Sequence, residues 1–211
     1  MSALLARAAS TIAFSATLLM ALPAQGQALS ASEQERLARG ETVTREQTID
    51  DEDRRFVGGV TYTVVEAGVS ELTDLLDDVR SYEHLLPRTK RARLVGQRGL
   101  DQLVELRQGN AVFDTSYTIR IRHEPWRREV RFWLDPSRPH DIVDAWGFFR
   151  VDPLPDTGSG VRSLVTYGVL VNLGPGIVRE LFEERLRAVM LSVPQILRRY
   201  VAEVRRARGR G

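Results

Sequence analysis

From residue 56 to residue 171 the chain repeatedly alternates apolar and polar positions at the period of a β-strand. In Val112–Arg122, for example, the odd positions carry Phe113, Tyr117 and two isoleucines, while the even positions from 114 onward are polar or charged. Alternation of this kind indicates a strand with one buried and one solvated face. Turn-forming residues separate seven such stretches: Phe56–Glu66, Arg91–Gln97, Leu100–Arg107, Val112–Arg122, Glu129–Leu134, Asp141–Val151 and Val161–Val171. Short strands at this spacing predict an antiparallel meander.

Other stretches repeat apolar residues every three or four positions, which is the period of an α-helix. Ser70–Val79 predicts a short helix, and Tyr82–Leu86 predicts a helical turn that Pro87 ends. A helix of about 30 residues should follow Gly174–Gly176, with a kink at Pro194. Its apolar stripe consists of Ile177, Leu181, Phe182, Leu186, Val189, Met190, Val193, Leu197, Val201 and Val204.

This order of elements predicts an α+β fold of the helix-grip type. We expect a curved antiparallel sheet of about six to seven strands wrapped around the long C-terminal helix. The two short helices after the first strand would close one end of the sheet. A small apolar ligand would bind between sheet and helix, because that arrangement encloses space.

The N-terminus has the three parts of a secretory signal peptide. Arg7 precedes an apolar stretch of 15 residues, Ala8–Leu22, and the small residues around Ala28 suit cleavage. That stretch is shorter than the roughly 20 residues of a spanning helix. We therefore expect residues 1–28 to be removed and the protein to be periplasmic or secreted; the alternative is an uncleaved anchor.

Three further segments complete the expected organisation. Residues 29–54 form a polar, charge-mixed leader that we expect to be solvated, with a short helix at Glu33–Arg39 that Gly40 ends. Residues 55–207 form the folded domain, and residues 208–211 form a basic tail. The acidic run at Asp50–Asp53 lacks the glycine turn and distal glutamate of a calcium loop.

Composition excludes several classes of function. Apolar residues make up 43% and charged residues 27% of the chain, which is typical of a globular protein. With 30 basic and 28 acidic residues, the chain lacks the basic excess of a nucleic-acid binder. It contains no cysteine, which excludes disulfides, thiolate metal sites and a lipidated N-terminal cysteine. Lys90 is the only lysine and follows no glycine, so there is no P-loop.

Several stretches resemble the START-like superfamily, which includes Bet v 1, polyketide cyclases and coenzyme-Q-binding START proteins. Val79–Pro87 is similar to the family's D-Y-x-x-hydrophobic-P helix, and Val165–Tyr167 is similar to its V-x-Y strand. Asp144–Phe149 resembles the family's G-x-W-x-hydrophobic strand, with Asp144 where glycine is common. The resemblance covers about Arg54–Arg205. The export signal and polar leader depart from it and suggest a member located in the cell envelope.

The resemblance implies a cavity for a lipid, isoprenoid, sterol or polyketide, and only some members of this family are enzymes. Large side chains of the predicted sheet and of the long helix are the candidates for lining such a cavity, although they also suit an ordinary core. The candidate ligand-binding residues are Phe113, Tyr117, Phe132, Trp146, Phe148, Tyr167, Leu186 and Met190.

No motif identifies a catalytic or metal site, and we expect no cofactor. Asp156–Ser159 spells the D-T-G-S sequence of aspartic proteases, but it lies between two strands and has the composition of a turn. The three histidines, His84, His123 and His140, lack zinc-binding spacing; we expect His84 on the short helix and the other two in loops. Among the charged residues of the strands, any that faces inward would be a candidate acid, base or ligand anchor. These are Asp114, Arg120, Arg131, Asp144 and Arg162.

Three functional hypotheses remain open at this point. The favoured one is an exported, non-enzymatic protein that binds a hydrophobic small molecule, and it predicts a substantial apolar cavity. A cavity filled by the protein's own aromatic side chains would count against it. The second is a polyketide cyclase or aromatase-like enzyme, which needs an ionisable side chain in the cavity. The third is an envelope interaction module. The Arg-rich C-terminus suits weak contact with anionic lipid, although a solvated helix end is the favoured interpretation.

Overall fold

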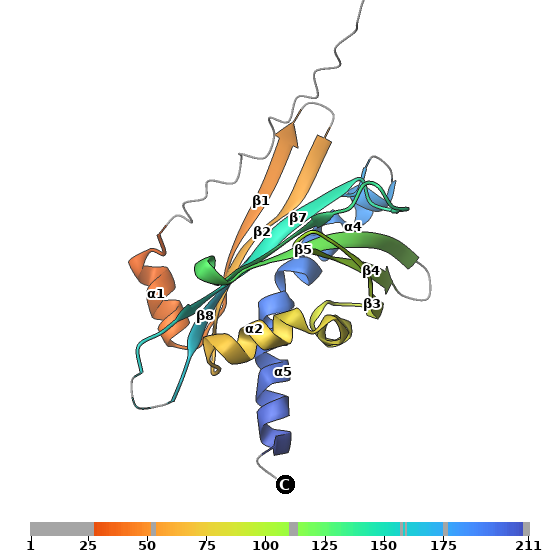
Figure 1. Ribbon diagram of the computed structural model, residues 1–211. Helices are drawn as coiled ribbons and strands as arrows, with labels where there is room; N and C mark the ends of the chain where they lie inside the picture. Colours follow the sequence, from red (N-terminus) through yellow and green to blue (C-terminus); the bar gives the residue numbers. More distant parts are fainter. Residues whose placement is uncertain are drawn as a thin grey trace, which may run out of the picture.

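A computed structural model shows one antiparallel sheet curved around a C-terminal helix (Figure 1). It describes residues 28–51, 54–109, 114–156, 158, 160–174 and 177–208; of residues 177–182 and 208 it describes the backbone alone. The strand order across the sheet is β1-β2-β8-β7-β6-β5-β4-β3. The strands are β1 (Val43–Asp51), β2 (Arg54–Val65), β3 (Thr89–Arg98), β4 (Asp101–Gly109), β5 (Asp114–Glu124), β6 (Glu129–Leu134), β7 (Asp144–Pro153) and β8 (Ser163–Asn172).

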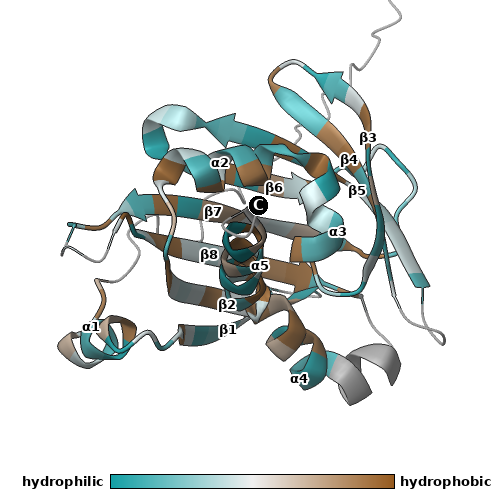
Figure 2. Cartoon of the chain, turned by 90° about the horizontal axis from the view of Figure 1, so that it is seen from below, coloured by the Kyte–Doolittle hydropathy of each residue, from teal (hydrophilic) through white to brown (hydrophobic). Residues whose placement is uncertain are grey.

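The described helices include those that the apolar periodicity predicts, together with η1 and η2, which it does not predict. They are α1 (Ala31–Ala38), α2 (Val69–Asp77), η1 (Val79–Ser81), α3 (Tyr82–Leu85), η2 (Pro125–Arg127), α4 (Ile177–Leu191) and α5 (Val193–Arg208). Helix α5 crosses the concave face and packs on β2, β8 and α3. Figure 2 shows α5 end-on with the curved sheet around it and with α2 and α3 beside it. The expected helix-grip architecture is therefore present, with eight strands instead of six or seven.

The additional strand comes from the segment that we expected to be a solvated leader. Strand β1 pairs with β2 along its whole length, from Val43 opposite Tyr62 to Asp51 opposite Arg54. The short helix before it begins at a Ser30 capping box and packs Leu37 with Val43 and Tyr62 in a second, smaller core. The leader is thus part of the folded domain from about residue 30. Residues 1–27, and with them most of the expected signal peptide, lie outside the described part.

The C-terminal helix is broken instead of kinked. Ser192 separates α4 from α5, and Pro194 is the second residue of α5, where its missing N–H costs no helical hydrogen bond. The backbone N–H groups of Gln195 and Ile196 turn back to the Ser192 carbonyl. None of the helices in the described residues is both long and apolar enough to span a membrane.

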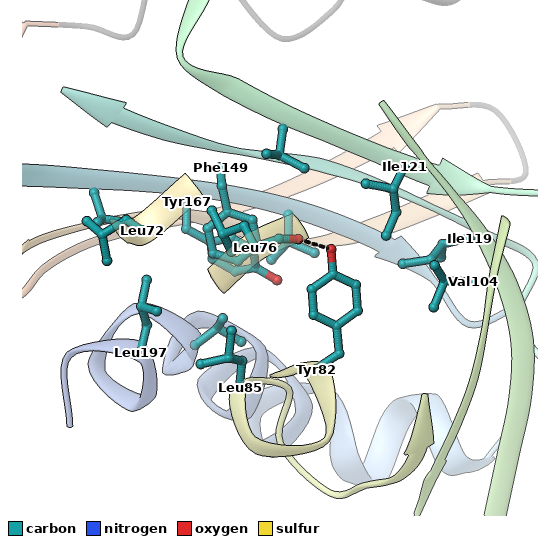
Figure 3. Packing of buried hydrophobic residues seen from close by; sticks show 14 of the residues in the cluster. Leu72, Leu76, Tyr82, Leu85, Val104, Ile119, Ile121, Phe149, Tyr167 and Leu197 are labelled. Carbon is teal, nitrogen blue, oxygen red and sulfur yellow. Dashed lines mark hydrogen bonds between the residues drawn. The ribbon is translucent and has the colours of Figure 1, made fainter. Parts of the chain in front are cut away.

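Most of the core lies between the concave face and the helices. In β7, Ala145, Phe149 and Val151 are buried on that face, while the residues between them belong to the convex face. The cross-strand register carries the same face into β6 and β8, so that Val130, Phe149 and Tyr167 lie in one row. The buried cluster also includes Leu72 of α2 and Leu197 of α5 (Figure 3).

Candidate functional site

An aromatic group occupies the middle of the concave face. Phe132 of β6, Phe149 of β7 and Tyr167 of β8 contact one another, with ring centroids 4.5 to 6.4 Å apart. Gly147 lies directly opposite Phe132 in the register, and a side chain there would collide with the Phe132 ring. The glycine therefore lets the ring lie flat across the sheet. Of the candidate ligand-binding residues, Phe132 and Tyr167 lie together here.

Tyr82 fills the space between the helices and the β4–β5 part of the sheet. It extends from the four-residue helix α3 into the buried cluster that also holds Val104 and Ile119, with its hydroxyl directed at Leu76 (Figure 3). The side chain is 6% exposed, and its hydroxyl donates a 2.7 Å hydrogen bond to the backbone carbonyl of Leu76. Burial, aided by the charges of Asp77 and Asp78, raises the pKa of Tyr82 well above its usual value. The phenol is therefore neutral at physiological pH.

A second buried phenol lies on β5, where Tyr117 takes the predicted face beside Ile119. Its hydroxyl donates a 2.5 Å hydrogen bond to Gln108, whose amide in turn donates to Thr89 and Pro87. Burial raises the pKa of Tyr117, and burial followed by the neighbouring Tyr117 raises that of Tyr167. The concave face thus carries apolar walls with a few neutral hydroxyl groups, which is how ligand sites for small apolar molecules are built.

Two candidate residues, Trp146 and Phe148, lie on the other face of the sheet. They alternate with Ala145 and Phe149, whose side chains point inward, so they project from the convex face. Phe148 covers Gly168 and packs under the guanidinium of Arg150. These two aromatic side chains therefore do not border the space between sheet and helices.

The remaining three candidates lie in different surroundings. Met190 of α4 packs against the main core, and Leu186 is half-buried on the same helix. Phe113 lies outside the described residues. The binding role of the residues that do face inward remains a prediction.

The charged candidates on the strands form ion pairs on the convex face. Arg120 pairs with Asp135 at 2.7 Å and Arg131 with Glu129 at 2.6 Å, while Asp114 pairs with Lys90 and Arg107. None of these three residues faces inward. Asp144 is on the convex face as well and accepts a hydrogen bond from the N–H of Ala145, and Arg162 is partly buried just before β8.

An ionisable side chain of the sheet that does face inward is His123, which we expected in a loop. It lies on β5 opposite Val130 of β6, and its Nδ1 atom is 2.5 Å from Oδ1 of Asp77 at the end of α2. His84 lies on α3 as expected and stacks on Tyr200, and His140 is in a loop. The alternation in β5 could have identified His123, since it has the same parity as Ile119 and Ile121.

The other sequence features have structural roles. Asp156 accepts a hydrogen bond from the N–H of Gly158 in the connection between β7 and β8, as expected for a turn. Within the described residues no three histidine or acidic side chains gather into a metal site. Of the basic C-terminal residues, Arg198 donates to the carbonyl of Gly40 and Arg205 pairs with Glu71.

The structure is similar to solved structures that share a sheet wrapped around a C-terminal helix. One is a STAR-related lipid transfer protein from Xanthomonas axonopodis, with a TM-score of 0.56, 16% identity, and coverage of 74% of this chain and 98% of that one. Another is a START superfamily protein from Mycobacterium smegmatis, with a TM-score of 0.51, 16% identity, and coverage of 69% and 97%. The chain has the START-like fold.

The START-like fold does not by itself decide between binding and catalysis. Norcoclaurine synthase from Thalictrum flavum also matches, with a TM-score of 0.51, 12% identity, and coverage of 76% of this chain and 88% of that one. An enzyme and a lipid transfer protein thus share this architecture with the chain. No family model and no curated protein sequence matches it.

In this START-like chain the described part of the concave side is filled by the protein's own side chains. Tyr82, Phe149 and Tyr167 are each less than a tenth exposed. An open groove of about 220 Å³ lies between β1 and the break between α4 and α5, lined by Thr44, Glu46, Ala188, Leu191, Ser192 and Gln195. Around the three aromatic side chains the described interior is packed, which counts against a preformed cavity there.

Proposed function

We propose that this protein binds a hydrophobic small molecule between the curved sheet and the helices, without catalysing a reaction. The START-like fold carries the proposal, since a lipid transfer protein shares it; because the described interior is filled, a ligand has to displace the buried Tyr82. Helix α5 packs on the same concave face, but on β2 and β8, nearer the β1 end of the sheet. A ligand that displaced Tyr82 would meet Val104, Ile119 and Ile121, which are all buried and apolar.

Displacing Tyr82 requires the ring to leave the core and α3 to move with it. The residue belongs to a four-residue helix between η1 and β3, and its hydroxyl is held by one hydrogen bond to a backbone carbonyl. A net stabilisation of about 0.5–1.5 kcal/mol is typical of such a bond. Helix α3 packs on β3, and Glu83 accepts a hydrogen bond from the N–H of Ala92, so a ligand would have to replace the apolar contacts of α3 as it moves. In the closed state Tyr82 acts as a plug that keeps the site filled in the absence of ligand.

The chemistry of the lining supports an apolar ligand with few polar groups. The buried tyrosines are neutral, and the charged strand residues pair on the convex face. A charged side chain inside the site would hold water there, and a hydrocarbon ligand would have to displace that water. Because the charged strand residues named here pair on the convex face instead, the site favours an apolar ligand. We also propose that the protein is exported, on the strength of the N-terminal signal described above.

A cyclase or aromatase-like enzyme is the alternative, and His123 favours it. A histidine held beside a carboxylate on the concave side supplies a group that can accept and return a proton. An enzyme would turn over a bound substrate, whereas a binding protein would release it unchanged.

Native mass spectrometry of the full chain, expressed with its N-terminal segment and purified without detergent, tests the proposal. We expect a near-stoichiometric fraction of the protein to carry a small apolar molecule, which denaturing extraction releases and identifies. The same spectrum measures whether residues 1–28 have been removed. A folded protein that carries nothing and takes up no lipid from an added bacterial lipid extract would contradict the proposal and favour the envelope interaction module.

A further inference from the structure

A polar pair lies at the rim of the concave face, where β5 passes the end of α2. The side chain of His123 is 20% exposed and that of Asp77 is 47% exposed, so the pair lies at the border between interior and solvent. Inward from His123 on the same face of β5 are Ile121 and Ile119, which are 1% and 6% exposed. A ligand beside the two isoleucines could therefore reach the pair with one end.

Two acceptor atoms at this rim have no hydrogen-bond partner. Both ring nitrogens of His123 are shielded from solvent, and the Nε2 atom contacts no donor. The Oε1 atom of Gln102 is likewise buried without a partner. Gln102 lies on β4 directly opposite Ile121, so it shares the concave face and is the diagonal neighbour of His123.

The contact with Asp77 determines which nitrogen of His123 is free to accept. Nδ1 and the carboxylate oxygen are 2.5 Å apart, although the pair lacks the alignment of a full hydrogen bond. In the neutral ring one nitrogen carries the proton, and the neighbouring carboxylate favours the tautomer that carries it on Nδ1. Nε2 then has a lone pair directed away from Asp77. The rim therefore presents two acceptors, and both need a donor.

We propose that His123 binds a hydroxyl group of the ligand beside Gln102, so that the substrate class is an apolar molecule with an alcohol or phenol at one end. This inference rests on the proposed function and names the ligand of the same site. An unmatched buried acceptor destabilises a protein, and such atoms are nearly always paired in native structures. The O–H of a ligand would donate to one of them, Nε2 of His123, while the apolar body of the ligand contacts Ile121 and Ile119.

Tyr82 gives an internal example of the same ligand chemistry. It places one apolar ring with one hydroxyl in the cluster that includes Ile119 and Val104, close enough to Asp77 for that charge to raise its pKa. The plug is thus itself a phenol, held beside the rim pair. A ligand that replaces it would contact the same apolar side chains and add the hydrogen bond that Nε2 of His123 lacks.

Calorimetric titration with two probes of similar size tests the inference. 2-Naphthol carries a hydroxyl donor, and 2-methoxynaphthalene replaces that donor with an ether. We expect the wild-type chain to bind 2-naphthol about three- to tenfold more tightly, the ratio expected for one hydrogen bond. His123→Phe should abolish the preference and leave the affinity for 2-methoxynaphthalene unchanged. His84→Phe is the matched control: it keeps the ring that stacks on Tyr200 and should keep the preference.

A second variant keeps the test decisive if His123→Phe does not fold. Asp77 is half exposed, so Asp77→Asn should fold, and it should reduce the preference for 2-naphthol because Nδ1 loses its anionic partner. Nitrogen NMR of the His123 ring should show Nε2 unprotonated in the wild type. Equal binding of both probes to the wild type would overturn the inference but leave the proposed function standing. If neither probe binds, both fall.

Discussion

At the scale of single residues, the convex face is held by carboxylates buried among arginines. Asp135 is 1% exposed and accepts hydrogen bonds from Arg120 at 2.7 Å and from the hydroxyl and N–H of Ser137. Chiefly through the Arg120 hydrogen bond, the pKa of Asp135 lies well below its usual range. A carboxyl whose pKa falls on folding stabilises the folded state at neutral pH.

Asp135→Asn should therefore destabilise the protein by about 3 kcal/mol at pH 7, the low end of the range for breaking a buried ion pair. The ordinary pKa of an aspartate is near 4, so the contribution of Asp135 is complete above that pH and is lost as the pH falls below it. Urea unfolding at pH 7 and at pH 3 should show the wild-type advantage shrinking at the lower pH. Asp156→Asn, in an exposed turn, should change stability by less than 0.5 kcal/mol; an equal effect at both sites would contradict this assignment.

Tyr82→Ala should open the space that the phenol now fills. We expect a loss of about 3–5 kcal/mol, typical of removing a buried aromatic ring. p-Cresol, which is the side chain of tyrosine as a free molecule, should restore about 2.7 kcal/mol at a hundred times its Kd. Urea unfolding with and without p-cresol measures this.

Leu37→Ala is the control for that experiment, because it destabilises the second core without leaving a ring-shaped space. p-Cresol should not restore its stability. Equal rescue of both variants, or none of Tyr82→Ala, would mean that the space behind Tyr82 does not accept a ligand.

The alternation of side chains along β7 was predictable from the sequence, but which of its two faces points at the helices was not. Trp146 and Phe148 are the largest side chains of that strand, and size alone suggested that they face inward. The same parity carries Arg150 and Asp152, whose charges indicate the solvated face, while Ala145 and Gly147 have the parity of the core. Charge was thus a better guide than ring size, because the inner surface already holds Phe132 over Gly147.

At the scale of elements, the break between α4 and α5 depends on a threonine from the sheet. Gln195 turns back to Ser192, so the Leu191 carbonyl has no helical donor, and the hydroxyl of Thr61 donates to it at 3.0 Å. Thr61 is fully buried on β2. The hydrogen bond thus holds the break between α4 and α5 against β2.

Thr61→Val keeps the shape of the side chain and removes that donor. The unpaired carbonyl should cost about 1–3 kcal/mol, which chemical denaturation would measure. Thr73→Val is the matched control. Its hydroxyl also bonds to a carbonyl, that of Val69, but this carbonyl is already bonded within α2, so the change should be below 0.5 kcal/mol. A larger effect at Thr73 would disprove this account of the break.

Sequence patterns located most elements, and their one omission has a physical cause. The seven predicted strands and both short helices are present because each has a clear apolar period. Strand β1 reads Val-Thr-Arg-Glu-Gln-Thr-Ile-Asp-Asp, with polar residues on both faces. Its inner face does not meet the apolar core but contacts Arg187 of α4, which bonds to Glu46 and Thr48. A strand whose inner side chains contact a charged residue far along the chain lacks the apolar alternation by which a sequence reveals a strand.

At the scale of the whole molecule, the N-terminal segment and the C-terminal helix support each other across the sheet. Removing residues 1–53 would delete β1 and α1, expose Tyr62 and leave the buried Arg187 without Glu46. We expect that truncation to lose at least several kcal/mol of stability or to fail to fold. Removal of residues 1–27 should leave the melting temperature unchanged within a few degrees. Equal melting temperatures for both truncated chains would contradict an integral β1.

The sequence could not predict whether the interior is open or filled. Whether a concave sheet encloses a cavity depends on side chains that arrive from distant elements, here Tyr82 from α3. Its motif, Tyr82–Pro87, predicted a helical turn but not where the ring would point. The functional question is therefore whether this filled interior opens to a ligand.

Methyl NMR of the chain during a titration with 2-naphthol tests that central claim most directly. If the ligand replaces Tyr82, the methyl signals of Ile119, Ile121 and Val104 should shift together with one saturating dependence on concentration. The methyls of Leu37 and Val43, in the second core on the convex side, should not move. Shifts confined to the second core, or no saturable shift on the concave face, would contradict the account.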